Sequence, residues 1–498
     1  MRTKKLVLLI VTLATVAVAF VGLVSAEPFP KQSVPTSDFI VNSTGDAPDN
    51  NIFDGNCDTG NLTTTFEPEC TLRAAIEQLN QSSQGTHHTV TFAIAGAGPH
   101  TIAPATAFNT INRPTLIDGL SQAGSSCPSA ENPGVFKIVL AGSAISVGNF
   151  AGLSLAAGSD GSTIQGLIIG DFGKQTTNIL GSAISISASD THTIRCNQIG
   201  LAADGVTVME NLFGISITNA MSNTIGGSQT ADRNIIANSS IGVQLNNNAV
   251  NNHFYNNYIG TSADGTTAAP NSTGFNIIGS SHDNIIGIPG QGNLIAFNAV
   301  NAIQLIGSSA PFSVGNSWRG NSMHSNGLLA INLRPSGENV NSVTANDDLD
   351  RDDGPNLLQN FPILASATRA PIGGSLNSTP NTTVTIDFYA NSSCDPTGHG
   401  EGGTWLGSET VTTDAMGNAT FSSGLSVTST ILTATATDPA GNSSEFSQCF
   451  QVGTPTAIRL ANQAAVTSNR LVWGAMMLLL LGSLAIVWFR PKPHPTSK

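Results

Sequence analysis

The sequence predicts an all-β protein whose central part is a right-handed parallel β-helix. Residues 197–211 and 257–271 match one another at an offset of about 60 residues. Each copy contains about three units of roughly 20 residues, in which a short apolar run precedes a turn rich in Asn and Gly. The chain has 51 glycines in 498 residues and few helix-forming residues. A fixed period of this kind is typical of stacked units that bury their apolar faces only against their neighbours.

The charge balance narrows the classes of function. Only 10% of the residues are charged, and the formal net charge is −13. Between Lys31 and Lys492 the only lysines are Lys137 and Lys174. A nucleic-acid-binding surface needs clustered basic side chains that contact phosphates. The sequence therefore predicts no nucleic-acid partner, and its length allows two or three domains.

The two ends predict export and a membrane anchor. Residues 1–26 combine a basic start, an apolar run and a small-residue site before Glu27, which is typical of a secretory signal peptide. Because the apolar run is long, an uncleaved N-terminal anchor is the alternative. Residues 471–489 are apolar and uncharged, and they are long enough to span a bilayer as a helix. Residues 490–498 would be a cytoplasmic tail, so we expect a single-pass protein of the cell surface.

Six cysteines in an exported chain predict disulfide bonds, and free buried thiols are the alternative. Six cysteines allow 15 pairings, of which we expect the one that follows their order in the sequence. The clustered spacing of a zinc site is missing from the sequence. The expected bonds are Cys57–Cys70, Cys127–Cys196 and Cys394–Cys449.

After a leader at residues 27–37, residues 38–130 are expected to cap the β-helix. Leu72, Ile76 and Leu79 have the spacing of one helix face and predict a helix over residues 70–80. A β-helix ends in open strand edges and an exposed core, and terminal units must be capped. We therefore expect this helix to lie across the first coil. Arg73 is expected to pair with a carboxylate or with turn carbonyls rather than to catalyse a reaction.

This N-terminal segment resembles a known module. Residues 41–46 (VNSTGD), 55–57 (GNC) and 70–76 (CTLRAAI) are similar to the CSLREA domain of bacterial and archaeal surface proteins. Ala74 stands where that family has Glu. The resemblance covers residues 38–100, and it implies that β-helix repeats follow and that the protein lies at the cell surface. It implies no biochemical activity.

Residues 131–365 are predicted to form the β-helix proper, with about ten coils of short strands. Asp204 and Asp264 occupy the same place in two repeats, so we interpret them as turn formers. Asn recurs at the turns, where it tolerates the left-handed conformation and can stack from coil to coil with hydrogen bonds. These structural asparagines are Asn197, Asn223, Asn234, Asn257, Asn284, Asn293, Asn316 and Asn321.

The densest acidic stretch, residues 346–356, predicts a calcium site. Hard cations bind several carboxylate oxygens, and the expected ligands are Asp348, Asp350, Asp352 and Asp353. The Gly and Glu positions of an EF-hand loop are not matched. A solvated acidic loop is the alternative, and no other cofactor is expected.

Residues 366–452 predict an Ig-like β-sandwich. Short apolar strands alternate there with turns that contain Asp, Pro and Gly. Residues 453–470 are polar and small, and we expect them to form a stalk that leads to the anchor.

Two functions from different classes fit this organisation. One is a non-catalytic rod or adhesin-like module that contacts extracellular polysaccharide or a surface protein. The other is a membrane-tethered polysaccharide lyase or glycoside hydrolase, since right-handed β-helices include such enzymes. The repeats contain few arginines and little lysine, which favours the first, and no catalytic residue is predicted. Ligand contacts are expected where the two repeat copies differ, at Tyr255, Tyr258, Trp318 and His324.

Overall fold

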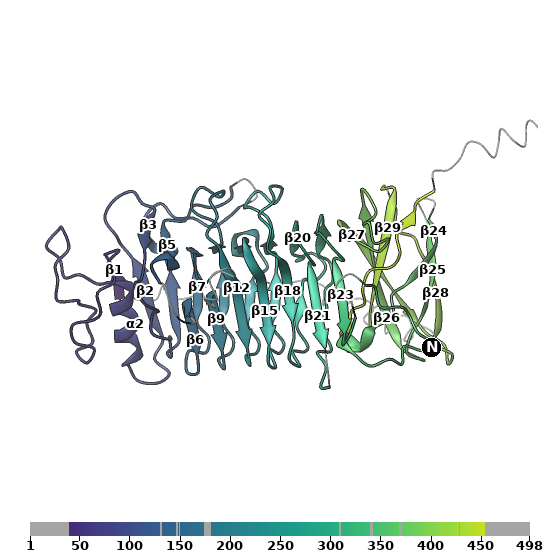
Figure 1. Cartoon of the computed structure of the whole chain (residues 1–498), viewed down its shortest axis with the longest axis horizontal. Helices are drawn as coiled ribbons and strands as arrows, with labels where there is room; N and C mark the ends of the chain where they lie inside the picture. The colour runs from purple at the N-terminus through teal and green to yellow at the C-terminus, as the bar shows by residue number, and fades with distance from the viewer. Residues whose placement is uncertain are drawn as a thin grey trace, which may run out of the picture. The chain divides into compact units, whose positions relative to one another are not determined.

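The computed structural model describes residues 39–453, except 130, 131, 146, 147, 149, 174–180, 308, 309, 339–341, 368–370 and 428. These residues form a parallel β-solenoid followed by two antiparallel sheets (Figure 1). The predicted signal peptide, leader, stalk, membrane helix and tail lie outside the described residues, apart from residue 453 at the start of the stalk. Within the described part of the chain, no helix is both long and apolar enough to cross a membrane.

Three parallel sheets, which we call S1, S2 and S3, form the solenoid. S1 contains β1 (Phe39–Val41), β2 (His88–Phe92), β4 (Thr115–Asp118), β7 (Thr163–Gln165), β10 (Thr193–Arg195), β13 (Thr224–Gly226), β16 (His253–Tyr255) and β19 (Ile285–Ile286). S2 contains β3 (His100–Ile102), β5 (Ile138–Ala141), β8 (Leu167–Gly170), β11 (Gln198–Ile199), β14 (Ile235–Ile236), β17 (Tyr258–Ile259), β20 (Leu294–Ala296) and β22 (Ser322–His324). S3 contains β6 (Phe150–Ala156), β9 (Gly181–Ser187), β12 (Asn211–Thr218), β15 (Ser239–Asn246), β18 (Thr273–Ile277), β21 (Ile303–Gly307) and β23 (Ile331–Pro335).

Each coil is longer than the sequence suggested. Equivalent turn residues of neighbouring coils, such as Asn223 and Asn252 or Asn252 and Asn284, are separated by 29 and 32 residues. The 60-residue repeat therefore spans two coils of three strands each, and the expected units of 20 residues are wrong. For the same reason S1 and S2 have eight strands each, fewer than the ten coils expected.

Aligned apolar side chains make the core continuous along the solenoid. Ile184, Ile215 and Val243 are register partners on neighbouring S3 strands, and all three are fully buried. Because every inner position meets a similar residue one coil away, each coil is covered on both sides. The two ends of this core are where caps are needed.

The helix α2 (Leu72–Asn80) caps the first coil, and the predicted helix is confirmed. Leu72, Ile76 and Leu79 are at most 1% exposed and belong to the solenoid core. The Thr71 hydroxyl accepts a hydrogen bond from the Ala74 amide as the N-cap. S1 begins at β1, before this helix in sequence, so the parallel stack runs through the segment predicted as a separate cap.

Arg73 has the structural role expected of it. Its guanidinium donates to both carboxylate oxygens of Asp46 at 2.9 and 3.0 Å. It also donates to the Thr106 and Ala107 carbonyls at 2.8 and 3.0 Å. The side chain is 7% exposed. Arg73 therefore ties α2 to two other segments of the N-terminal module.

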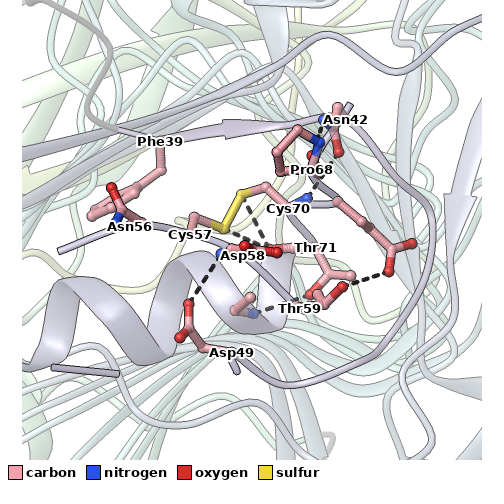
Figure 2. Close-up of a disulfide and its surroundings, with 12 residues drawn as sticks. Phe39, Asn42, Asp49, Asn56, Cys57, Asp58, Thr59, Pro68, Cys70 and Thr71 are labelled. Carbon is pink, nitrogen blue, oxygen red and sulfur yellow. Dashed lines mark hydrogen bonds between the residues drawn. A yellow bond between two sulfur atoms is a disulfide. The ribbon is translucent and has the colours of Figure 1, made fainter. Parts of the chain in front are cut away.

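All three predicted disulfides are present, and the pairing is the one expected. Figure 2 shows the bond between Cys57 and Cys70, with Thr71 beside it at the start of the helix. Cys127–Cys196 joins a loop before β5 to the turn after β10. Cys394–Cys449 lies in the C-terminal part.

Two antiparallel sheets follow the solenoid and share one core, to which both contribute buried apolar side chains. One contains β24 (Ile363–Ala367), β25 (Ile372–Asn377) and β28 (Asn418–Ser423), and the other contains β27 (Thr404–Thr412), β26 (Thr383–Asn391), β29 (Ile431–Thr437) and β30 (Phe450–Gln451). Short 3-10 helices lie at Gly119–Ser121, Gly142–Ala144, Thr230–Asp232 and Pro355–Leu358. The Ig-like class of this sandwich and the handedness of the coils stay predictions.

Candidate functional site

Buried asparagines form ladders at the turns, and all eight predicted ladder residues belong to two of them. In each step the side-chain Nδ2 of one Asn donates to Oδ1 of the Asn in the next coil, at 2.8 to 3.5 Å. One ladder contains Asn197, Asn234, Asn257, Asn293 and Asn321, and the other contains Asn223, Asn252, Asn284, Asn316 and Asn356.

Asn was expected at these turns because it tolerates the left-handed conformation, but none of these eight residues adopts that conformation. At six of these eight positions the left-handed conformation falls on the residue before the ladder Asn, as at Cys196, Ser222 and Asn256, where φ is 53°, 58° and 57°; before Asn234 and Asn293 it does not. The ladder residue itself then turns its amide inward, where it satisfies buried backbone groups. None of this leaves the amides free for a ligand.

The repeated Asp204 and Asp264 are turn formers, as predicted. Asp204 Oδ1 accepts from the Val206 and Thr207 amides, and Asp264 Oδ1 accepts from the Thr266 and Thr267 amides. The hydrogen bonds from Thr207 lower the pKa of Asp204 to about 2. Both carboxylates are therefore ionised and fully used in local hydrogen bonds.

The four predicted ligand contacts do not come together. Trp318 is fully buried, and its indole Nε1 donates to the Ser444 carbonyl at 3.0 Å. A ligand cannot reach it, so this part of the prediction is wrong. Tyr255 lies on β16 in S1, whereas Tyr258 and His324 lie on β17 and β22 in S2. The Tyr258 ring stacks under the Arg233 guanidinium at 3.7 Å.

Three carboxylates of the acidic stretch do converge. Oxygens of Asp347, Asp350 and Asp352 all lie within 4.8 Å of one another, and the three residues are half-buried. Asp348 and Asp353 are exposed and stay outside this group, whereas Asp347 was not among the expected ligands. We call Asp347, Asp350 and Asp352 the acidic cluster.

The environment of the acidic cluster suits a cation. Burial, then the neighbouring carboxylates, raise the pKa of Asp350 to about 6, and the same causes raise that of Asp352 to about 6. Asp350 accepts hydrogen bonds from the Asn360 amide and the Ser378 hydroxyl. Asp352 Oδ1 is shielded from solvent and has no hydrogen-bond partner in the described part of the chain. A hard divalent cation would satisfy this oxygen and relieve the repulsion.

The sandwich closes the C-terminal end of the solenoid with ionisable side chains. A third, shorter ladder contains Asn271, Asn298 and Asn326. Glu401 Oε1 accepts from the amide and side chain of Asn326, its last residue, at 3.0 and 2.9 Å. Glu445 accepts from the Leu333 and Thr344 amides, each at 2.9 Å. Arg319 of the last coils donates to Asp387 of β26. The sandwich therefore supplies the acceptors that a following coil would have supplied.

These contacts predict that stability falls as pH rises above about 5. Burial raises the pKa of Glu445 to about 8 and that of Glu401 to about 7, and Glu338 and Asp395 add to this through repulsion. An acid with a raised pKa holds its proton more tightly in the folded state, so its stabilising effect is lost as pH rises through the folded pKa. The melting temperature should therefore fall between pH 5 and pH 9 more in the wild type than in Glu445→Gln. Glu67→Gln, at an exposed position, should keep the wild-type dependence; an unchanged slope in Glu445→Gln would contradict the assignment.

The outer face of S3 carries a row of uncharged polar side chains that the sequence analysis missed. Its members are register partners on successive strands: Ser154, Ser185, Ser216, Gln244, Asn276 and Gln304. Figure 1 shows these strands, β6 to β21, side by side. Of all residues in the seven S3 strands, only Arg334 is ionisable. Successive members are 28 to 32 residues apart, so recognising the length of a coil would have revealed this row.

The three parallel sheets and the three disulfides show that the chain is a disulfide-bonded parallel β-solenoid protein. No protein-family model matches the chain, and no curated protein matches it; the CSLREA resemblance therefore stays a prediction. Among solved structures, ORF18 of Geobacillus virus E2 is 15% identical with a TM-score of 0.27, covering 71% of this chain and 72% of that one. Full-length tailspike protein 2 from the Escherichia coli O157:H7 bacteriophage CAB120 is 12% identical with a TM-score of 0.23, covering 77% and 66%. Likeness this weak carries no argument about function.

Proposed function

We propose that this chain is an exported, non-catalytic surface protein whose solenoid contacts extracellular carbohydrate through the outer face of S3. The observation that carries the proposal is the uncharged polar row on that face. Serine, asparagine and glutamine side chains both donate and accept hydrogen bonds, as sugar hydroxyls do. Neighbouring parallel strands repeat every ~4.8 Å, so the half-buried members of the row offer similar groups to an extended polymer. These members are Ser154, Ser185, Ser216 and Asn276, whereas Gln244 and Gln304 are buried and hydrogen-bond to Asn276.

The alternative, a polysaccharide lyase or glycoside hydrolase, has less support. A lyase of this type needs a basic side chain beside its substrate, and a hydrolase needs two suitably spaced carboxyl groups. Arg195 is paired with Asp232, Arg319 is paired with Asp387, and Arg233 stacks on Tyr258. These arginines are held in structural contacts, and the S3 strands contain no carboxylate.

Export and membrane anchoring are part of the proposal. The three disulfides support an oxidising compartment. In this proposal residues 1–26 are the export signal and residues 471–489 are the membrane anchor. The contacted molecule would then lie outside the cell. A protein of another cell surface is the alternative partner.

Affinity electrophoresis of the full-length chain tests the proposal. Gels that contain neutral or acidic polysaccharides should retard the folded chain but not the heat-denatured chain. Reduced mobility in at least one neutral polysaccharide is the expected result. Equal mobility in every gel would overturn carbohydrate contact and leave a protein partner as the alternative.

We also propose that the acidic cluster binds Ca²⁺, with Asp347 replacing the Asp348 and Asp353 expected from the sequence. Calcium at millimolar concentration should raise the melting temperature by about 2 °C or more, because a ligand that binds only the folded state stabilises it. Removal with EDTA should reverse the effect. Asp352→Asn should abolish it, whereas Asp353→Asn, in the same stretch but outside the cluster, should not. Equal calcium responses in the two variants would rule the cluster out.

A further inference from the structure

A groove of 320 Å³ opens on the outer face of S3 next to the N-terminal module. Its floor is formed by β6, β9 and β12, and residues 107–110 form one wall. Beyond the wall, Ile111 pairs with Leu155 of β6, and its amide donates to the Ser154 carbonyl at 2.8 Å. The volume falls within the range of about 300–1,000 Å³ that is usual for small-molecule sites. We call this feature the S3 groove.

The wall of the S3 groove is held in place by the N-terminal module. Arg73 donates to the carbonyls of Thr106 and Ala107, and its guanidinium lies 5.1 Å from the centre of the Phe108 ring. Asp46, the ion-pair partner of Arg73, also accepts from the Ala105 amide at 2.8 Å. Arg73 is thus a positioning residue for the groove, which is formed before any ligand arrives.

A hydroxyl inside the groove is left without a protein partner. Ser182 lies between Ala151 and Phe213 in the S3 register, lines the groove and is only 7% exposed. Within the described residues its hydroxyl makes no hydrogen bond, and the same is true of Ser185 and Ser216 beside it. None of the three oxygens is among the solvent-shielded atoms without a partner, so water fills these sites in the free protein and a ligand can replace it.

The lining residues that the structure describes combine these hydroxyls with aromatic surface and carry no charge. Phe108, Phe150 and Phe213 contribute apolar surface, and none of the described residues that line the groove is ionisable. A phosphate or carboxylate would find no counter-charge among these described residues. A sugar ring presents an apolar C–H surface and a rim of hydroxyls, which matches phenyl rings beside free serine hydroxyls.

We propose that the S3 groove binds one or two rings of an uncharged carbohydrate chain. This inference rests on the proposed function and narrows it to neutral glycans at one place on S3. The sugar ring packs against the phenylalanines, and its hydroxyls exchange hydrogen bonds with Ser182, Ser185 and Ser216. The rest of the polar row, where Gln244 and Asn276 bond to one another, continues the surface along which the chain extends.

Binding of hexasaccharides to the full-length chain tests the proposal. The probes are cellohexaose, maltohexaose and mannohexaose as neutral chains and hexagalacturonate as an acidic one, measured by isothermal titration calorimetry. Ser185→Ile fills the groove with a residue that suits a β-strand and removes one hydroxyl. The matched control is Ser187→Ile, on the same strand and half-buried like Ser185, but outside the groove lining. Ser216→Ile is a second groove variant, and circular dichroism confirms the fold of all three.

The expected result is that at least one neutral hexasaccharide binds the wild type, and that Ser185→Ile and Ser216→Ile raise its Kd by about tenfold or more. Ser187→Ile should keep the wild-type Kd. Unchanged affinity in both groove variants would overturn the groove but leave carbohydrate contact elsewhere on the solenoid. Binding of hexagalacturonate alone would overturn the neutral-glycan assignment. No binding by any hexasaccharide or in the polysaccharide gels would overturn both proposals.

Discussion

Replacing Arg319 with Ala should lower the free energy of unfolding by about 3–5 kcal/mol. Arg319 Nε donates to Asp387 Oδ2 at 2.6 Å, and a terminal nitrogen donates to Oδ1 at 3.2 Å. The Asp387 side chain is fully buried. Without Arg319 this carboxylate keeps one side-chain donor among the described residues, the Trp405 indole at 2.8 Å. An uncompensated buried charge between the last coil and the sandwich should destabilise the folded state of both parts.

The matched control is the exposed pair of Arg195 and Asp232. A nitrogen of Arg195 lies 3.0 Å from an oxygen of Asp232, but the Arg195 side chain is 44% exposed. Exposed ion pairs contribute about 0–1 kcal/mol, so Arg195→Ala should have a small effect. Urea denaturation followed by circular dichroism compares the two variants. Equal losses would show that the pair between Arg319 and Asp387 does not hold the sandwich on the solenoid.

Replacing Asn257 with Ala should cost about 3 kcal/mol or more. Asn257 Oδ1 accepts from the Asn234 side chain at 2.9 Å, and its Nδ2 donates to the Asn293 side chain and the Ile225 carbonyl at 3.0 and 2.9 Å. The residue is fully buried in the middle of its ladder. Its loss leaves buried donors and acceptors on both neighbouring coils without partners, and each costs about 1–3 kcal/mol.

An exposed asparagine supplies the comparison for this variant. Asn56 lies in an exposed turn of the N-terminal module, and Asn56→Ala should change stability by no more than about 0.5 kcal/mol. The measurement is the midpoint of urea unfolding for both variants. A small effect at Asn257 would mean that the ladder is a by-product of stacking rather than a source of stability.

The fold was largely predictable, because its signals are local and repeated. The internal match, the helix face of Leu72, Ile76 and Leu79, and the order of the cysteines each identified a feature that the structure contains. The coil length was misjudged because the 60-residue repeat contains six strands, and strands alone do not show which of them stack. Register between coils is a long-range property, and it became visible only through pairs such as Asn223 and Asn252.

The candidate sites were predictable only in part. The acidic stretch is conspicuous, but which carboxylates converge depends on how residues 347–352 turn, and Asp347 was missed. Trp318 differed between the repeat copies because the last coil meets the sandwich there, not because it faces a ligand. The S3 groove joins residues 107–110 to three coils, and it depends on Arg73 holding that wall. The sequence pattern of one segment cannot predict a groove that is formed by several segments far apart in the chain.

The central claim is that the solenoid contacts carbohydrate without cleaving it. The most direct test is to incubate the full-length chain with a neutral polysaccharide that retards it, with and without calcium, and to measure new reducing and unsaturated chain ends over time. The predicted result is retention with no more chain ends than in buffer alone. A rise in chain ends that scales with protein concentration would contradict the claim and identify a polysaccharide-degrading enzyme.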